Sequence, residues 1–190
     1  MSAFTRLAIP DVILVAPTVF SDNRGTFCEI YSRQRYEEVG IAAGFVQDNE
    51  SLSIIKGTVR GLHFQTPPFD QAKLVRVVSG SIFDVAVDLR RGSPTYGRWV
   101  GATLTADKGE QLFIPRGFAH GFCTLKPETR VLYKVDNGYS REHDAGIRWN
   151  DPDLAVDWPL GDSDAVLSDR DLKLPGFAEF QTPFEMARSR

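Results

Sequence analysis

The stretch GEQLFIPRGFAH, residues 109–120, decides the fold that we expect for this chain. It contains a glycine, five further residues, Pro115-Arg-Gly117, two more residues and then His120. The apolar centre of the stretch, residues 111–114, is predicted to form a strand after the turn at Lys108-Gly109. The stretch therefore predicts a strand that is followed closely by a histidine.

An earlier stretch has a related pattern. Residues 57–65 read GTVRGLHFQ, and Lys73 and Gly80 follow after a longer loop. Together the two stretches resemble the two motifs of the cupin fold, in which the strands of one small barrel point ligands inward. The resemblance implies a double-stranded β-helix, or jelly roll.

The rest of the sequence agrees with an all-β fold. Period-two alternation, which is typical of strands, occurs in segments 25–30, 45–53, 59–64, 73–79, 81–89, 99–105, 111–114 and 130–135. Residues 32–39 are predicted to form a helix, with Ser32 as a possible N-cap and Gly40 as its stop. Many short strands without alternating helices indicate an antiparallel sandwich or barrel of jelly-roll type, with a few short peripheral helices.

Length and composition favour one domain. The chain has 190 residues, of which 42% are hydrophobic, so it can bury a core of ordinary size. We expect a single domain over residues 1–190, with a barrel core from about residue 20 to about residue 150. The remainder, about residues 151–190, is richer in aspartate and proline and is expected to wrap the barrel.

Charge and hydropathy argue against two kinds of partner. With 22 basic and 25 acidic residues the net charge is −3, which gives no basic face of the kind that nucleic acid needs. The apolar runs are too short to span a membrane, and residues 1–17 lack the features of a signal peptide. We therefore expect a cytoplasmic protein in which Cys28 and Cys123 are reduced thiols.

The substitutions within the cupin pattern argue against a bound metal. A metal-binding cupin carries His-x-His, a downstream Glu and a final His, whereas here Gln65 and Lys73 replace the second His and the Glu. His63 and His120 alone are too few ligands for a transition metal, and a lysine ammonium would repel a divalent ion. The sequence also lacks the glycine fingerprint of a dinucleotide site. We expect neither a metal nor a cofactor.

The same residues predict acid–base chemistry. A neutral imidazole at His63 is a natural general base, and the Lys73 ammonium can stabilise the charge of an enolate oxygen. Tyr133, in the predicted strand 130–135, could donate a proton from the opposite side of a bound ring. Taken singly, each residue has a commoner structural explanation, as a core or surface side chain. The combination predicts removal of a proton next to a carbonyl, followed by return of a proton.

Longer motifs identify a resemblance to a known family. Residues 47–51 (QDNES), 57–65, 73–76 (KLVR), 115–122 (PRGFAHGF) and 139–143 (YSREH) resemble the dTDP-4-dehydrorhamnose 3,5-epimerase family. The resemblance implies a homodimeric jelly roll that acts on dTDP-4-dehydro-6-deoxy-D-glucose. It also implies inversion at C3 and C5, which gives dTDP-4-dehydro-L-rhamnose for dTDP-L-rhamnose biosynthesis.

The resemblance implies a role for each matching residue. His63 would be the base and Tyr133 the proton donor, while Lys73 would lie beside the C4 oxygen. Asp171 would orient His63, with Asp169 as a competing candidate only two residues away. Substrate-binding positions would be Arg24, Glu29, Gln47, Asp48, Asn49, Arg60, His120, Tyr139, Asp144 and Arg170. In this set Tyr139 would stack on the thymine, and Asp144 stands where the family usually has glutamate.

Three alternatives remain open at this point. The protein could be a mono-epimerase at C3 or C5, or a keto-isomerase, on the same type of sugar nucleotide. It could also be a metal-dependent cupin enzyme, which the ligand count disfavours, or a cupin that binds a sugar nucleotide without catalysis. Retention of both His63 and Tyr133 favours an epimerase over an isomerase.

Overall fold

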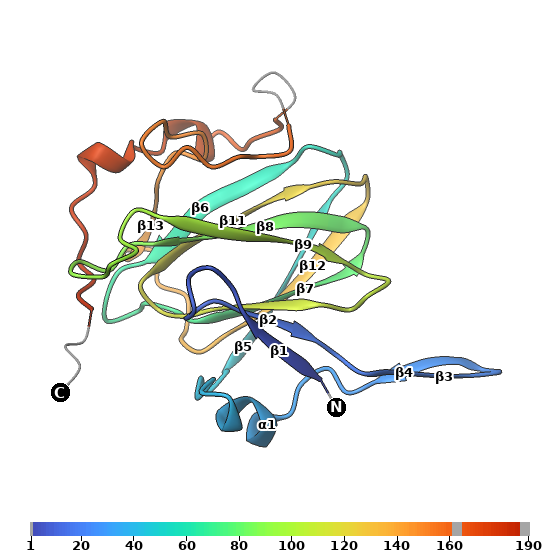
Figure 1. Cartoon of the computed structure of the whole chain (residues 1–190). Coiled ribbons are helices and arrows are strands. Elements are labelled where there is room, and N and C mark those ends of the chain that lie inside the picture. The colour runs from blue at the N-terminus through green and yellow to red at the C-terminus, as the bar shows by residue number, and fades with distance from the viewer. Residues whose placement is uncertain (1, 161–164, 187–190) are drawn as a thin grey trace.

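Two antiparallel sheets facing each other form the body of the protein (Figure 1). This computed structural model describes residues 2–160 and 165–186. The six-stranded sheet has the order β1 (Ala3–Arg6), β2 (Ile13–Ala16), β10 (Gln111–Ile114), β7 (Lys73–Ser79), β12 (Thr129–Val135) and β5 (Gln47–Ser53). The five-stranded sheet has the order β13 (Asp144–Gly146), β6 (Val59–Gln65), β11 (Phe118–Thr124), β8 (Ser81–Asp88) and β9 (Trp99–Thr105).

The remaining elements are short. A hairpin of β3 (Val19–Asp22) and β4 (Gly25–Cys28) projects away from both sheets (Figure 1). The α-helix α1 (Arg33–Glu38) follows it, and the 3-10 helices η2 (Asp171–Lys173) and η3 (Phe177–Glu179) lie near the C-terminus. Within residues 2–160 and 165–186, none of the helices has the length and apolar character needed to cross a membrane.

Apolar side chains fill the space between the sheets. Val75, Leu112 and Val131 of the six-stranded sheet belong to one buried cluster with Ile82 and Leu104 of the five-stranded sheet. Full burial of one such side chain contributes about 1.5–3 kcal/mol to stability. Burial of these side chains therefore stabilises the packing of the two sheets against each other.

Two further clusters cover the outer faces. Tyr36 of α1 packs with Ile13 and Phe113 on the outer face of the six-stranded sheet. Trp158 and Phe184, from the C-terminal segment, pack on the outer face of the five-stranded sheet. The C-terminal segment thus packs on this sheet, and residues 161–164 and 187–190 of the expected wrap lie outside the described residues. The boundaries expected for one domain stay a prediction, and β1 and β2 belong to the sheet although they precede residue 20.

The prediction of an all-β jelly roll is confirmed. The eight predicted strands correspond to β4 through β10 and to β12, and the predicted helix corresponds to α1. The sequence interpretation missed β1, β2, β3, β11 and β13. Every residue of β11 is buried, so this strand lacks the alternation by which half-buried strands are recognised. Both cysteines are free, as expected.

A pair of glycines lets β6 and β11 come close together. A Cβ atom on Gly61 would lie 2.5 Å from the Cα atom of Gly121, and Gly61 has a φ of +143°. In the same pairing His63 lies opposite His120. The two glycines therefore allow the close strand contact that sets both histidines side by side.

We predict that Gly61→Ala lowers the free energy of unfolding by about 1–3 kcal/mol, because the added methyl group overpacks the contact with Gly121. Gly44→Ala is the matched control, since a Cβ there meets no heavy atom within 4 Å. It should change stability by less than about 0.5 kcal/mol. Urea unfolding followed by circular dichroism measures both values, and equal stability of the two variants would contradict the prediction.

Candidate active site

A cleft lies between the two sheets. Its inner part has a volume of about 390 Å³ and its outer part about 380 Å³. Both parts are lined by His63, Lys73, Tyr133 and Arg170, so they form one continuous space. Strands of both sheets and residues 166–171 of the C-terminal segment form its walls.

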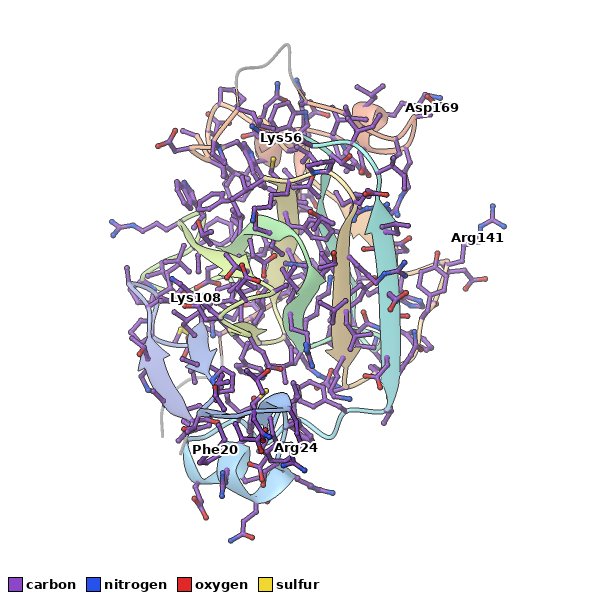
Figure 2. The ribbon with its side chains drawn as sticks, turned by 90° about the vertical axis from the view of Figure 1, so that its right-hand side faces the viewer. Phe20, Arg24, Lys56, Lys108, Arg141 and Asp169 are labelled. Atoms are coloured by element: carbon purple, nitrogen blue, oxygen red, sulfur yellow. The ribbon has the colours of Figure 1, made fainter. Side chains whose placement is uncertain are left out.

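His63 contacts a carboxylate from the C-terminal segment. Its Nε2 atom lies 2.6 Å from Oδ1 of Asp171. Burial acts to raise the pKa of Asp171, but the hydrogen bond and charge of His63, together with hydrogen bonds from Gly61 and Ser168, lower the pKa overall. An Nε2–H that donates to this carboxylate leaves the Nδ1 lone pair free to accept a proton. Asp169 is exposed and points outward (Figure 2), so Asp171 is the residue that pairs with His63.

A second histidine–carboxylate pair lies deeper in the cleft. The Nε2 atom of His120 is 2.7 Å from Oδ1 of Asp84, on the neighbouring strand β8. Burial lowers the pKa of His120, and Asp84 opposes this effect only in part. Sequence reasoning missed Asp84. Its signal was the one carboxylate within the apolar run of residues 82–87, since a buried charge requires a partner.

Lys73 brings a positive charge to the cleft. It begins β7 and is half-buried. Burial lowers its pKa to about 8, while the negative charges of Asp84 and Asp144 act in the opposite direction. Lys73 is therefore mostly an ammonium at pH 7, and it can lose its proton at a pH not far above neutral.

Tyr133 enters the cleft from the sheet opposite the histidines. It belongs to β12 of the six-stranded sheet, as Lys73 does to β7, whereas His63 and His120 belong to β6 and β11 of the five-stranded sheet. Burial raises the pKa of Tyr133, so its phenol keeps its proton at neutral pH. An imidazole and a protonated phenol thus lie on opposite walls of one cavity.

The outer part of the cleft is polar. Gln47 and Asn49 of β5 line it, and their side chains are joined by a hydrogen bond of 2.7 Å. The hydroxyl of the exposed Tyr139 donates to Oδ2 of Asp144 at 3.1 Å. Oδ1 of the same carboxylate lies 2.7 Å from Nη2 of Arg170. Asp144 therefore links an aromatic ring and a guanidinium at the mouth of the cleft.

Arg60 lines the inner part of the cleft. Its guanidinium donates to Oγ of Ser53 and to the carbonyl of Leu52, both at 3.2 Å. Because β5 and β6 belong to different sheets, Arg60 bridges the two walls. Its position is suited to an anionic group of a ligand in the cleft.

The hairpin residues do not reach this cleft. Arg24 is exposed and pairs with Asp22 at 2.6 Å, and Glu29 pairs with Arg35 at 2.8 Å. Figure 2 shows Arg24 at the opposite end of the molecule from Asp169. Within one chain, the structure therefore separates these two predicted binding residues from the others.

Asp48 also lies away from the cleft. Side chains alternate along β5, so Gln47 and Asn49 point into the cleft and Asp48 points to the outer face. There Asp48 forms an ion pair of 2.8 Å with Lys134. Asp48 therefore does not line this chain's own cleft, and its assignment to substrate binding stays a prediction.

Taken together, the cleft contains groups that move protons. An imidazole with its carboxylate, a phenol and an ammonium share one space between two sheets. In the part of the chain that the structure describes, no three His, Cys, Asp or Glu side chains are grouped to hold a metal. Fold and site define a class of protein, a jelly roll with an acid–base site between its sheets.

Comparison with known proteins gives the family. The family model described as dTDP-4-dehydrorhamnose 3,5-epimerase matches residues 6–179. A protein of that name from Pseudomonas aeruginosa is 52% identical over 92% of this chain and 96% of its own. The chain belongs to the dTDP-4-dehydrorhamnose 3,5-epimerase family.

Solved structures agree in fold as well as in sequence. A dTDP-4-dehydrorhamnose 3,5-epimerase from Bacillus anthracis, with TDP and PPi bound, has a TM-score of 0.90 and 48% identity, covering 93% of this chain and 100% of that one. A dTDP-6-deoxy-D-glucose-3,5-epimerase from Legionella pneumophila, in complex with dTDP-4-keto-L-rhamnose, has a TM-score of 0.93 and 41% identity, covering 98% and 100%.

We predict that Asp84→Asn lowers the pKa of Lys73 below about 8, because the negative charge of Asp84 favours the ammonium form. NMR titration of protein labelled at lysine Cε measures this pKa directly. Asp107→Asn, at an exposed turn between β9 and β10, is the control and should leave the Lys73 midpoint unchanged. An unchanged or raised midpoint in Asp84→Asn would show that Asp84 does not support the ammonium.

Proposed function

We propose that the protein is a dTDP-4-dehydrorhamnose 3,5-epimerase. It inverts C3 and C5 of dTDP-4-dehydro-6-deoxy-D-glucose and gives dTDP-4-dehydro-L-rhamnose, a step of dTDP-L-rhamnose biosynthesis. Family membership supports this activity. The observation that carries it is the position of His63 and Tyr133 on opposite walls of the cleft.

The chemistry begins with the C4 ketone of the substrate. The ring hydrogens on C3 and C5 are the ones next to this carbonyl, so they are the acidic ones. His63 removes such a hydrogen as a proton, and the electron pair of the C–H bond forms an enolate. The negative charge then lies on the C4 oxygen, where the Lys73 ammonium stabilises it. No hydride is transferred, so the reaction requires no NAD, and the Lys73 ammonium supplies the charge stabilisation for which other enzymes use a metal.

Tyr133 completes each inversion. A carbon changes configuration when its proton leaves on one face and another proton arrives on the opposite face. The raised pKa of Tyr133 supports this role, since its phenol carries the proton to be donated. Asp171 positions the His63 ring and stabilises the imidazolium that forms when the proton is taken. His120 lines the inner part of the cleft, where it can contact the sugar, and Asp84 holds the His120 ring from behind.

Other groups of the cleft suit the nucleotide part of the substrate. A pyrophosphate carries negative charge, and guanidinium groups bind phosphate oxygens through paired donors. Arg60 and Arg170 are the two such groups that line the cleft. Tyr139 offers an exposed ring for stacking on the thymine, and Gln47 and Asn49 offer amides for hydrogen bonds to the nucleoside.

The hairpin supports a homodimer. Phe20 and Phe27 of β3 and β4 are 61% and 72% exposed, although apolar side chains of this size are usually buried. In a symmetric dimer a projecting hairpin can lie against the partner, and then Arg24 and Glu29 would act in the partner's cleft. This arrangement agrees with their distance from the cleft of their own chain. We place the dimer in the cytoplasm, without nucleic-acid or membrane partners.

We predict that Tyr133→Phe still exchanges substrate hydrogens with solvent but loses net inversion by about 10²- to 10⁴-fold, since the base remains and the donor is absent. The substrate is incubated in deuterated water, and NMR reports label and configuration at C3 and C5. His63→Asn should abolish both exchange and inversion. Label at one carbon only would instead indicate a mono-epimerase, and normal inversion by Tyr133→Phe would refute the donor assignment.

The hairpin proposal predicts the activity of a mixed dimer, in which one protomer carries His63→Asn and the other carries Arg24→Glu. If each hairpin serves the partner's cleft, one cleft holds both substitutions and the other holds none, so about half of the wild-type activity returns. If the hairpin serves its own chain, each cleft holds one substitution and the mixed dimer stays inactive. Steady-state rates of separately tagged, co-purified dimers distinguish the two results.

A further inference from the structure

Tyr139 is an aromatic side chain held in place without packing. Its side chain is 62% exposed and lies in the loop between β12 and β13. An exposed ring of this kind would normally sample several orientations. In this structure, however, polar contacts fix both the backbone around Tyr139 and its hydroxyl group.

Contacts on both sides of Tyr139 come from one buried side chain, Gln65 at the end of β6, and Nε2 of Gln71 adds a longer bond of 3.3 Å to the Gly138 carbonyl. Its Nε2 atom donates to the carbonyl of Gly138 at 3.0 Å, and its Oε1 atom accepts the N–H of Ser140 at 2.6 Å. These are the residues immediately before and after Tyr139. The second Nε2 hydrogen goes to the carbonyl of Phe69 at 2.7 Å. Gln65 therefore clamps the loop on both sides of Tyr139.

The hydroxyl contact comes from the residue opposite Gln65. In the pairing of β6 with β13, Gln65 lies across from Asp144, whose Oδ2 accepts the Tyr139 hydroxyl. Residues opposite each other in antiparallel strands point to the same face of a sheet. One cross-strand pair thus holds Tyr139 at its backbone and at the tip of its ring.

An amide is well suited to this position. The contacts need two N–H donors and one carbonyl acceptor on a single side chain that is buried to 95%, with only 5% of its surface exposed. A carboxylate could accept from Ser140 but could not donate to Gly138 and Phe69. An apolar side chain would leave all three backbone groups without this partner.

We infer that Gln65 is a positioning residue that holds the Tyr139 ring in the orientation that stacks on the nucleotide base. The inference rests on the proposed function, in which Tyr139 binds the thymine. Because the ring is already oriented, nucleotide binding does not incur the entropic cost of ordering it. The nucleotide therefore binds more tightly. The reacting sugar lies at His63 and Tyr133, so Gln65 acts on binding and not on the proton transfers.

The test measures binding of dTDP by calorimetry, together with kcat and KM for the substrate. Gln65→Met keeps the size of the side chain and removes its hydrogen bonds. We expect dTDP affinity to fall about 2- to 10-fold and KM to rise in parallel, while kcat changes little. Gln65→Glu, which keeps one acceptor and loses both donors, should weaken dTDP binding in the same direction and serves where the Met variant folds poorly.

Gln111→Met is the matched control. Gln111 is also a buried glutamine, and its amide donates to Ile30 and Tyr36 on the α1 side of the protein. Its substitution should lower thermal stability without changing dTDP affinity. Equal losses of affinity in Gln65→Met and Gln111→Met would mean that the effect is general destabilisation, which overturns the inference.

A double-mutant cycle with Tyr139→Ala completes the test. Tyr139→Ala should weaken dTDP binding about 10-fold, as loss of one stacked base does. In that background Gln65→Met should cause no further loss, since the ring it positions is gone. A full additional loss would overturn the inference alone. Unchanged dTDP binding in Tyr139→Ala itself would instead refute the placement of the thymine, and the inference with it.

Discussion

The contact between His63 and Asp171 is the constraint on which the cleft depends. It joins a strand of the barrel to a segment 108 residues later in the chain, at 2.6 Å. The C-terminal segment can reach this position because it is anchored on the five-stranded sheet, where Phe180 and Phe184 pack against Phe64. One wall of the cleft is therefore completed only after the whole chain has folded.

The charges in the cleft depend on one another in the same way. Lys73 is placed where burial favours its neutral form, and Asp84 and Asp144 favour the ammonium. Asp84 also binds His120, so a single buried carboxylate favours the protonated form of two groups whose pKa values burial lowers. The positive charge is thus kept available in a cavity that would otherwise suppress it, and the partial burial of Lys73 strengthens its effect on a nearby oxygen.

Much of this could be predicted from sequence because the decisive residues lie in short, ordered motifs. His63, Lys73 and His120 stand in the two strand patterns that also predict the barrel, so fold and site were found together. Asp84 was missed because it stands outside the two motifs. That Asp48 faces away from the cleft could not be foreseen, because a motif does not show which side chains of a strand share a face.

Long-range geometry was the other limit of the sequence. The sequence alone does not distinguish Asp169 from Asp171 as the partner of His63. Only the path of the C-terminal segment shows that Asp171 reaches His63. The role of Gln65 was likewise hidden. The pattern shows that Gln65 replaces a histidine that would bind a metal. Its hydrogen-bond partners could not be recognised, because Gly138 and Ser140 lie more than seventy residues away in the sequence.

The position of His63 and Tyr133 in different sheets has a consequence for the protein's interior. No ladder of backbone hydrogen bonds spans the gap between them, so the packed layer of side chains determines their separation, as a spacer does between two plates. Val75 and Ala86, which do not line the cleft, belong to that spacer. Selection that preserves the volumes of these side chains therefore also preserves the distance between the base and the proton donor.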